Sequence, residues 1–177
     1  SKSQCALVNG SGVNLNHYKF SGINSDKHFL IIARLLGDKG IREFVKAARI
    51  VKKEYQDAIF EILGPEDPSP NRIPIHEVNK WVKDGDIIYS GSTSDVRPFI
   101  KKCSVFVLPS YHEGMPRTVL EAMAMGRPIL TTDVPGCRDT VINGKNGWLI
   151  KKSDEYELAD RMIWFIKNPE EAKQMGK

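Results

Sequence analysis

The chain has 177 residues, of which 41% are hydrophobic and 27% are charged. This length suits one domain with one core, and the composition excludes an intrinsically disordered chain. Lysine and arginine number 26 against 22 aspartate and glutamate residues, a formal net charge of +4. So small an excess does not indicate a nucleic-acid-binding module; it slightly favours an acidic small ligand or an anionic membrane surface.

No apolar run approaches the roughly 18 residues of a membrane-spanning helix, and the first residues lack the layout of a signal peptide. The three cysteines, Cys5, Cys103 and Cys137, are odd in number and show no CxxC spacing. This pattern argues against a disulfide framework and against a structural zinc site. We therefore expect a protein of the reducing cytoplasm.

Predicted elements alternate along the chain. Residues 1–26 predict a short strand at 6–9 and a linker, and the apolar run 28–36 predicts a strand buried on both faces. Helical spacing of apolar residues follows at 39–55. Further strands are expected at 58–63, 87–91, 104–109, 128–132 and 147–150, and further helices at 75–84, 94–103, 117–126, 154–167 and from Pro169 onward. This order predicts an α/β domain with a doubly wound parallel sheet.

In such sheets ligands bind beyond the carboxyl ends of the strands, which directs attention to segments 33–40 and 109–117. The chain contains neither a GxGxxG nor a GxxxxGK[ST] sequence, so neither a standard dinucleotide site nor a P-loop is predicted. A phosphate site could still be built from cationic side chains and helix N-termini.

Arg34 and Lys39 are the candidate cations. Both follow the first long strand and lie five residues apart, so they could converge on a diphosphate. An equally weighted alternative is that Arg34 pairs with a structural carboxylate while Lys39 is a solvated residue of the helix start.

The segment around Glu113 and Glu121 is the second candidate. Gly114 allows close approach of backbone to ligand, and Arg117 begins a helix whose first N–H groups lack intrahelical partners and suit an anion. Glu121 lies in an apolar helix, where a carboxylate needs hydrogen-bond partners such as a ribose diol. The alternative makes Glu121 an intramolecular salt-bridge partner and Glu113 an exposed loop residue.

The remaining reactive side chains give weaker signals. The four histidines show no spacing typical of metal ligands. Cys103 is expected to be a small buried hydrophobe, and Cys137 follows a strand end, from which it can face the cleft.

The motif EGMPRTVLE at 113–121, followed by AMAMGRP, resembles the E-x7-E motif of the family 4 retaining glycosyltransferases of the GT-B fold. ARLLGDKGIREFVKAA at 33–48 resembles the family's segment before its first helix, although Ala33 stands where many members have glycine. TTDVPGCRDTVINGKNGWLI at 131–150 resembles the loop facing the donor sugar and a following small hairpin. The resemblance covers about 28–167 and is closest to bacterial transferases of hexoses or N-acetylhexosamines for surface polysaccharides or lipid-linked oligosaccharides.

The resemblance implies catalytic roles for three residues. Arg34 and Lys39 would neutralise the donor diphosphate and stabilise it as the leaving group, so that no metal and no other cofactor is required. Glu113 would contact hydroxyls of the transferred sugar.

It also implies a donor-binding set. The backbone of Gly114 and Met115 would lie beside the sugar, Arg117 and Thr118 would meet the phosphates, and Glu121 would bind the ribose hydroxyls. Arg34 and Lys39 belong to this set as well.

The resemblance further implies a two-domain architecture of which this chain matches one half. Residues 1–26 would be an interdomain strand and linker, 27–168 the C-terminal, Rossmann-like donor-binding domain, and 169–177 the start of a truncated terminal helix. The acceptor-binding N-terminal domain is missing, so the chain alone should bind a UDP-sugar weakly and transfer nothing.

The partners implied for the whole enzyme are a nucleotide-sugar donor and a glycan or lipid-linked acceptor. Its implied place is the cytoplasm, with peripheral association at the inner face of the membrane. Two alternatives remain: half of a sugar-nucleotide epimerase of the same architecture, and a non-catalytic nucleotide-binding module.

Overall fold

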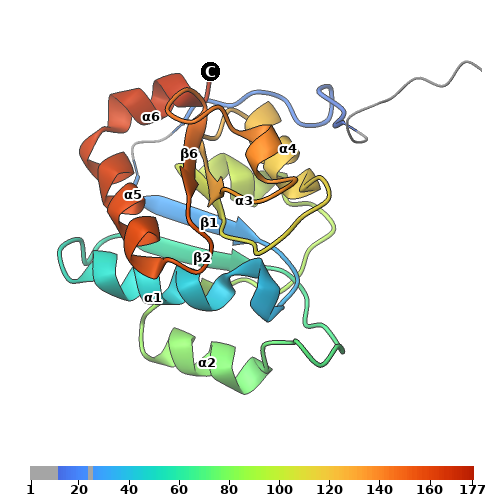
Figure 1. The fold of residues 1–177 in the computed structure, drawn as a ribbon, viewed down its shortest axis with the longest axis vertical. Coiled ribbons are helices and arrows are strands. Elements are labelled where there is room, and N and C mark those ends of the chain that lie inside the picture. The colour runs from blue at the N-terminus through green and yellow to red at the C-terminus, as the bar shows by residue number, and fades with distance from the viewer. Residues whose placement is uncertain (1–11, 24–25) are drawn as a thin grey trace, which may run out of the picture.

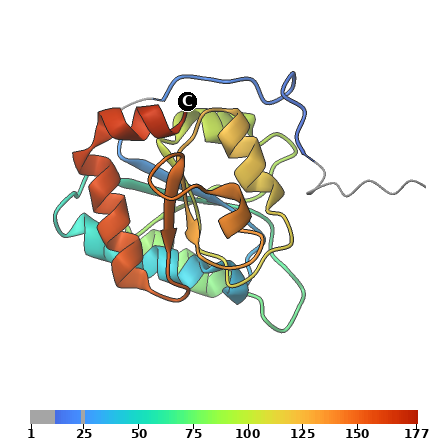
Figure 2. The same cartoon turned by 45° about the horizontal axis from the view of Figure 1, so that its top comes forward.

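The computed structural model describes residues 12–23 and 26–177. Six parallel strands form one sheet in the order β3-β2-β1-β4-β5-β6, with helices on both sides of it (Figures 1 and 2). The strands are β1 His28–Ile32, β2 Ile59–Leu63, β3 Ile88–Tyr89, β4 Val105–Leu108, β5 Ile129–Thr132 and β6 Gly147–Ile150. The helices are η1 Gly37–Lys39, α1 Ile41–Lys52, α2 Ile75–Lys83, α3 Arg97–Lys102, α4 Arg117–Ala124, η2 Arg138–Thr140, α5 Glu155–Lys167 and α6 Pro169–Met175. The predicted doubly wound α/β sheet is confirmed.

The central strands owe their position to uninterrupted apolar sequence. β1 pairs with β2 on one side, from His28 with Ile59 to Ile32 with Leu63, and with β4 on the other. All five residues of β1 are buried. A continuous apolar run predicts a strand buried on both faces, as found for β1. Because β1 and β4 are parallel neighbours, their carboxyl ends lie side by side.

Element boundaries differ from the prediction where side chains and turns intervene. β1 ends at Ile32 because the chain then turns: Leu35 N donates to Pro65 O at 2.9 Å, and η1 follows. α3 begins at Arg97 rather than at 94, since Asp95 Oδ1 accepts from the Arg97 N–H at 3.1 Å.

One prediction near the ends of the chain lies outside the described residues, and the prediction of a hairpin at 131–150 is wrong. The strand expected at 6–9 lies outside the described residues. β6 joins the sheet parallel to β5 instead of forming a hairpin. α6 is a short helix that ends before Gly176. Among residues 12–23 and 26–177, no helix is long and apolar enough to cross a membrane.

Candidate functional site

A pocket of about 200 Å³ lies at the carboxyl ends of β1 and β4. It is lined by Ile32, Ala33, Lys39, Leu108, Glu113, Met115, Pro116, Arg117 and Thr118. Five residues that the sequence singled out for donor binding therefore meet in one pocket. Arg34, Gly114 and Glu121 are not among its lining residues. Glu121 contacts the lining residue Arg117, Arg34 follows the lining residue Ala33 in the chain, and Gly114 lies between the lining residues Glu113 and Met115.

The turn that carries Lys39 is fixed by a glycine. Gly40 has a φ of +70°, and a Cβ atom there would lie 2.0 Å from the carbonyl oxygen of Pro109. Only glycine permits both the left-handed backbone and this close approach. Asp38 O accepts from Tyr111 N at 2.8 Å and from the Ser110 hydroxyl at 3.1 Å. These contacts bind η1 to the loop after β4, and Lys39 is held beside that loop.

Lys39 faces Glu113 across the pocket. Lys39 Nζ donates to Glu113 Oε1 at 2.7 Å, and the two side chains are only 17% and 16% exposed. Neither is thus the solvated residue that the alternative interpretation required. An ammonium and a carboxylate at the end of the sheet give the pocket one group that can bind an anion and one that can accept hydrogen bonds from hydroxyls.

Arg34 forms an ion pair that the sequence left unassigned. Its Nη1 donates to Asp67 Oδ2 at 2.6 Å, while Asp67 Oδ1 accepts from the Ser69 N–H at 2.9 Å. Hydrogen bonds from Ser69 and from Arg34 hold the pKa of Asp67 below its usual range. The Asp67 side chain is 5% exposed and that of Arg34 is 61% exposed. Arg34 therefore does pair with a structural carboxylate, yet among the described residues its guanidinium has this one hydrogen bond, so further N–H donors can bind an anion.

Glu121 is buried and engaged by two neighbours. Its Oε1 accepts from Arg117 Nε at 3.1 Å. The pKa of Tyr18 is raised, chiefly by burial and also by a hydrogen bond with Glu121. The Glu121 side chain is 7% exposed and that of Arg117 is 71% exposed. The alternative of an intramolecular salt bridge is thus present, and Glu121 contacts the pocket only through its partner Arg117.

The N-terminus of α4 is shaped for an anion. Pro116 precedes its first residue, and no side chain caps the helix. The loop facing it is packed closely, because a Cβ atom at Gly136 would lie 2.2 Å from Glu113 O and 2.5 Å from Gly114 O. The N–H groups of Arg117 and Thr118 therefore have no competing side-chain acceptor at the helix start, where the helix dipole favours negative charge.

Both described cysteines are buried. Burial raises the pKa of Cys103 to about 12, and burial also raises the pKa of Cys137. Cys137 is 0% exposed, so the expectation that it faces the cleft is wrong. Its thiol is hydrogen-bonded to the side chains of Thr131 and Thr132 in β5, and Cys137 is not among the residues that line the pocket. Within 12–23 and 26–177 no group of three or more His, Cys, Asp or Glu residues is placed to hold a metal ion.

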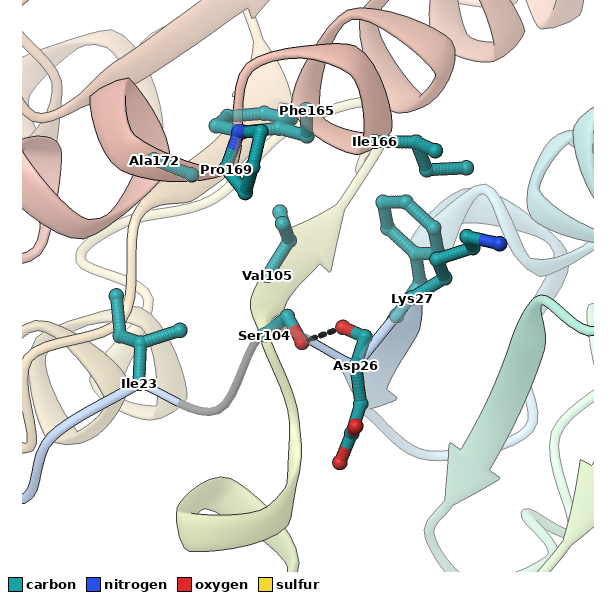
Figure 3. A pocket seen from close by; sticks show the side chains of 10 residues that line it. Ile23, Asp26, Lys27, Ser104, Val105, Phe165, Ile166, Pro169 and Ala172 are labelled. Atoms are coloured by element: carbon teal, nitrogen blue, oxygen red, sulfur yellow. Dashed lines mark hydrogen bonds between the residues drawn. The ribbon is translucent and has the colours of Figure 1, made fainter.

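A second cavity lies near the opposite, amino-terminal ends of β1 and β4 (Figure 3). Its volume is about 100 Å³, and its lining includes Phe29, Val105 and Phe165. Lys27, the cation in its lining, forms an ion pair with Asp57 at 2.6 Å. A mostly apolar lining with its one lysine already paired does not suit a diphosphate, so the carboxyl-edge pocket is the candidate site.

Two residues of the site were not predicted. Asp67 lies in the loop after β2, and Tyr18 lies in the irregular segment that precedes β1. Proline and polar residues around Asp67 gave no periodic signal, and Tyr18 stands in a segment of weak periodicity. Only the three-dimensional structure brings them to Arg34 and Glu121.

Comparison with known proteins agrees with this geometry. The sequence pattern of the family described as "Glycosyl transferases group 1" matches residues 16–177. The N,N'-diacetylbacillosaminyl-diphospho-undecaprenol alpha-1,3-N-acetylgalactosaminyltransferase of Campylobacter jejuni is 32% identical over 151 residues. That match covers 84% of this chain and 38% of the relative, so the chain spans well under half of that protein.

Solved structures share the fold. The C-terminal domain of the group 1 glycosyl transferase LpcC from Francisella tularensis superposes with a TM-score of 0.78 at 21% identity, covering 94% of this chain and 93% of that domain. HepE from Anabaena, solved in complex with UDP, gives a TM-score of 0.81 at 19% identity, covering 93% of this chain and 49% of that protein. The α/β sheet described above is thus the fold of a GT-B C-terminal domain.

Proposed function

The chain belongs to the group 1 glycosyl transferases, and we propose that it is the donor-binding half of a retaining GT-B enzyme. The enzyme would transfer a hexose or an N-acetylhexosamine from a UDP-sugar to a glycan or a lipid-linked acceptor. The observation that carries this proposal is the pocket in which Lys39 and Glu113 face each other beside the N-terminus of α4. The UDP in the HepE structure and the enzyme name of the Campylobacter relative support the choice of donor and acceptor class.

The diphosphate is assigned to the cationic side of the pocket. Lys39 would bind it directly, Arg34 would reach it with the N–H groups that Asp67 does not use, and the first N–H groups of α4 would complete the set. When the bond between the anomeric carbon and the β-phosphate oxygen breaks, negative charge develops on that oxygen. Fixed cations and N–H donors stabilise such charge without reorganisation, so this step requires no metal ion.

The hydroxyls of the donor are assigned to the two carboxylates. Glu113 would accept hydrogen bonds from the transferred sugar, with the Gly114 and Met115 backbone beside it. Glu121 would accept from the ribose diol, with Arg117 and Thr118 turned to the phosphates. Each carboxylate sits next to a cation of the site, which keeps the hydroxyl sites adjacent to the phosphate sites, as they are in a nucleotide sugar.

The acceptor would bind to a separate N-terminal half, so the chain alone should bind donor but transfer no sugar. Retention of the anomeric configuration follows from the resemblance to the family. The undecaprenol-linked acceptor in the name of the Campylobacter relative supports a cytoplasmic enzyme working at the inner face of a membrane, to which it would bind peripherally.

Calorimetric titration of the chain with UDP, and with GDP, ADP and NAD as controls, tests the donor site. We expect UDP to bind selectively, and Arg34→Ala and Glu121→Ala to weaken it by roughly 1–3 kcal/mol each, the scale of a lost charge-assisted hydrogen bond. Arg49→Ala is a matched control, because Arg49 pairs with Asp86 at the far end of α1. If wild-type chain and full-length enzyme both fail to bind UDP at millimolar concentration, the proposal is wrong.

A further inference from the structure

The Lys39–Glu113 ion pair lies where the two kinds of donor group would meet. Both residues line the same pocket, their charged atoms are 2.7 Å apart, and more than four-fifths of each side chain is buried. Under the proposed function Lys39 is a phosphate ligand and Glu113 is a sugar ligand. Before any ligand binds, the carboxylate of Glu113 is therefore paired with the same ammonium that would bind the diphosphate.

Both ends of this pair are anchored by backbone contacts. η1 holds Lys39 through the hydrogen bonds from Tyr111 and Ser110 to Asp38 O. The backbone of Glu113 is packed against Gly136, which has no room for a Cβ atom. These contacts fix the backbone at both residues, so a ligand that enters the pocket meets the carboxylate and the ammonium together.

The carboxylate acts differently on a nucleotide sugar and on a bare nucleoside diphosphate. The terminal phosphate of UDP can take a second negative charge, with a pKa near that of a phosphomonoester, about 6. In a UDP-sugar that oxygen is esterified, so the extra charge is absent and sugar hydroxyls are present to donate to a carboxylate. Like charges a few ångströms apart in a partly buried site repel by an amount that water does not fully screen.

We propose that Glu113 is a specificity-determining residue that favours the complete nucleotide sugar over the bare nucleoside diphosphate. With a sugar present, its carboxylate accepts hydroxyl hydrogen bonds. On transfer the bond between the anomeric carbon and the β-phosphate oxygen breaks with its electron pair left on that oxygen, and the anomeric carbon bonds to the acceptor oxygen, whose proton passes to the phosphate and from there to water. The sugar hydroxyls leave with the acceptor, and the carboxylate then repels the terminal phosphate and pairs with Lys39 again. Glu113 thereby promotes release of the product. This inference rests on the proposed donor site.

Calorimetry with UDP and with UDP-N-acetylglucosamine, on wild type, Glu113→Gln and Glu121→Gln, tests it. Glu113→Gln removes the negative charge but keeps an oxygen that accepts hydrogen bonds from hydroxyls. UDP should therefore bind about 3- to 10-fold tighter. This change corresponds to a free energy between that of an exposed ion pair and that of a buried hydrogen bond to a charged group. The affinity for UDP-N-acetylglucosamine should change less. Glu121→Gln should instead weaken both ligands alike, because both contain the ribose.

The ratio of the two dissociation constants decides the outcome. If Glu113→Gln leaves the UDP affinity unchanged or lowers it, Glu113 does not discriminate against the product and the inference is overturned. Glu113→Ala is the second variant: it too should tighten UDP binding, while it weakens UDP-N-acetylglucosamine. Thermal unfolding of each variant verifies that the fold is intact. Failure of both the wild-type chain and the full-length enzyme to bind either ligand would refute the proposed donor site itself, and this inference with it.

Discussion

Replacement of Arg127 by methionine should destabilise the domain strongly. The side chain is 1% exposed, and its guanidinium donates to the carbonyl oxygens of Cys103 at 2.9 Å, Gly22 at 2.9 Å and Ser21 at 2.5 Å. These bonds connect the segment before β1 to the start of β4. Methionine fills much of the same volume but donates nothing, so buried carbonyl oxygens would lose their partner.

The size of the effect follows from two opposing contributions. Hydrogen bonds from a charged donor contribute about 1.5–3 kcal/mol each, but burial lowers the pKa of Arg127, which shows that the buried charge itself is costly. The Ser21 and Gly22 carbonyls lie near the surface and can be rehydrated, whereas the backbone around fully buried Cys103 cannot. We therefore expect a net loss of about 3 kcal/mol, which lowers the melting temperature by roughly 6–12 °C in a domain of this size.

Urea unfolding and calorimetry of wild type and Arg127→Met measure this loss. Arg49→Met is the control, since Arg49 is an exposed arginine whose replacement should cost less than about 1 kcal/mol. Limited proteolysis should also cut within 12–23 faster in Arg127→Met, because that segment loses its attachment. If Arg127→Met unfolds within about 0.5 kcal/mol of wild type, the cost of burying the charge cancels the hydrogen bonds and the reasoning fails.

Three further outcomes are expected. Asp67→Asn should weaken UDP binding a few-fold in calorimetry, because a neutral amide orients its arginine partner less firmly; unchanged affinity would show that the arginine needs no support. In a Cys5→Ser background no thiol should react with a thiol reagent at pH 8 until urea unfolds the chain, since burial raises the pKa of Cys103 to about 12; rapid native labelling would contradict this. The hydrogen bonds from Arg42 lower the pKa of Glu77, so their stabilisation is present above the unfolded value of about 4.3 and is lost as pH falls through the folded pKa. Glu77→Gln should accordingly lose less stability than wild type between pH 6 and pH 3; equal losses would exclude this pair as a source of acid sensitivity.

The sheet could be predicted from sequence because a continuous apolar run is enough to identify each of its buried central strands. β1 and β4 are continuous apolar runs, and each is followed by turn residues and a helical stripe. β3 was predicted at five residues but has two, since Ile88 is 50% exposed at the edge of the sheet and packing decides little there. α3 begins three residues late because Asp95, and not Ser94, accepts from the first turn, a choice between two capping residues that spacing cannot resolve.

The sequence singled out charged residues that meet in the structure, but it did not give their pairing. Lys39 and Glu113 were named from their positions after two strand ends, and strand adjacency brings them together. Asp67 was missed because its partner Arg34 is 33 residues away and its loop carries no regular pattern. Cys137 was misplaced because a residue after a strand end can point into a cleft or back against the sheet, and spacing does not decide between the two; here the thiol is hydrogen-bonded to Thr131 and Thr132.

The two carboxylates that pair with Arg34 and Lys39 differ in how firmly they are held. Asp67 keeps a second hydrogen bond, from the Ser69 N–H, and is 5% exposed, so it is fixed whether or not Arg34 moves. Glu113 has Lys39 as its hydrogen-bond partner among the described residues and opens onto the pocket. A carboxylate with one partner can exchange it for sugar hydroxyls at little cost, whereas a carboxylate with two keeps its arginine oriented. This asymmetry is the reason for assigning orientation to Asp67 and discrimination between donor and product to Glu113.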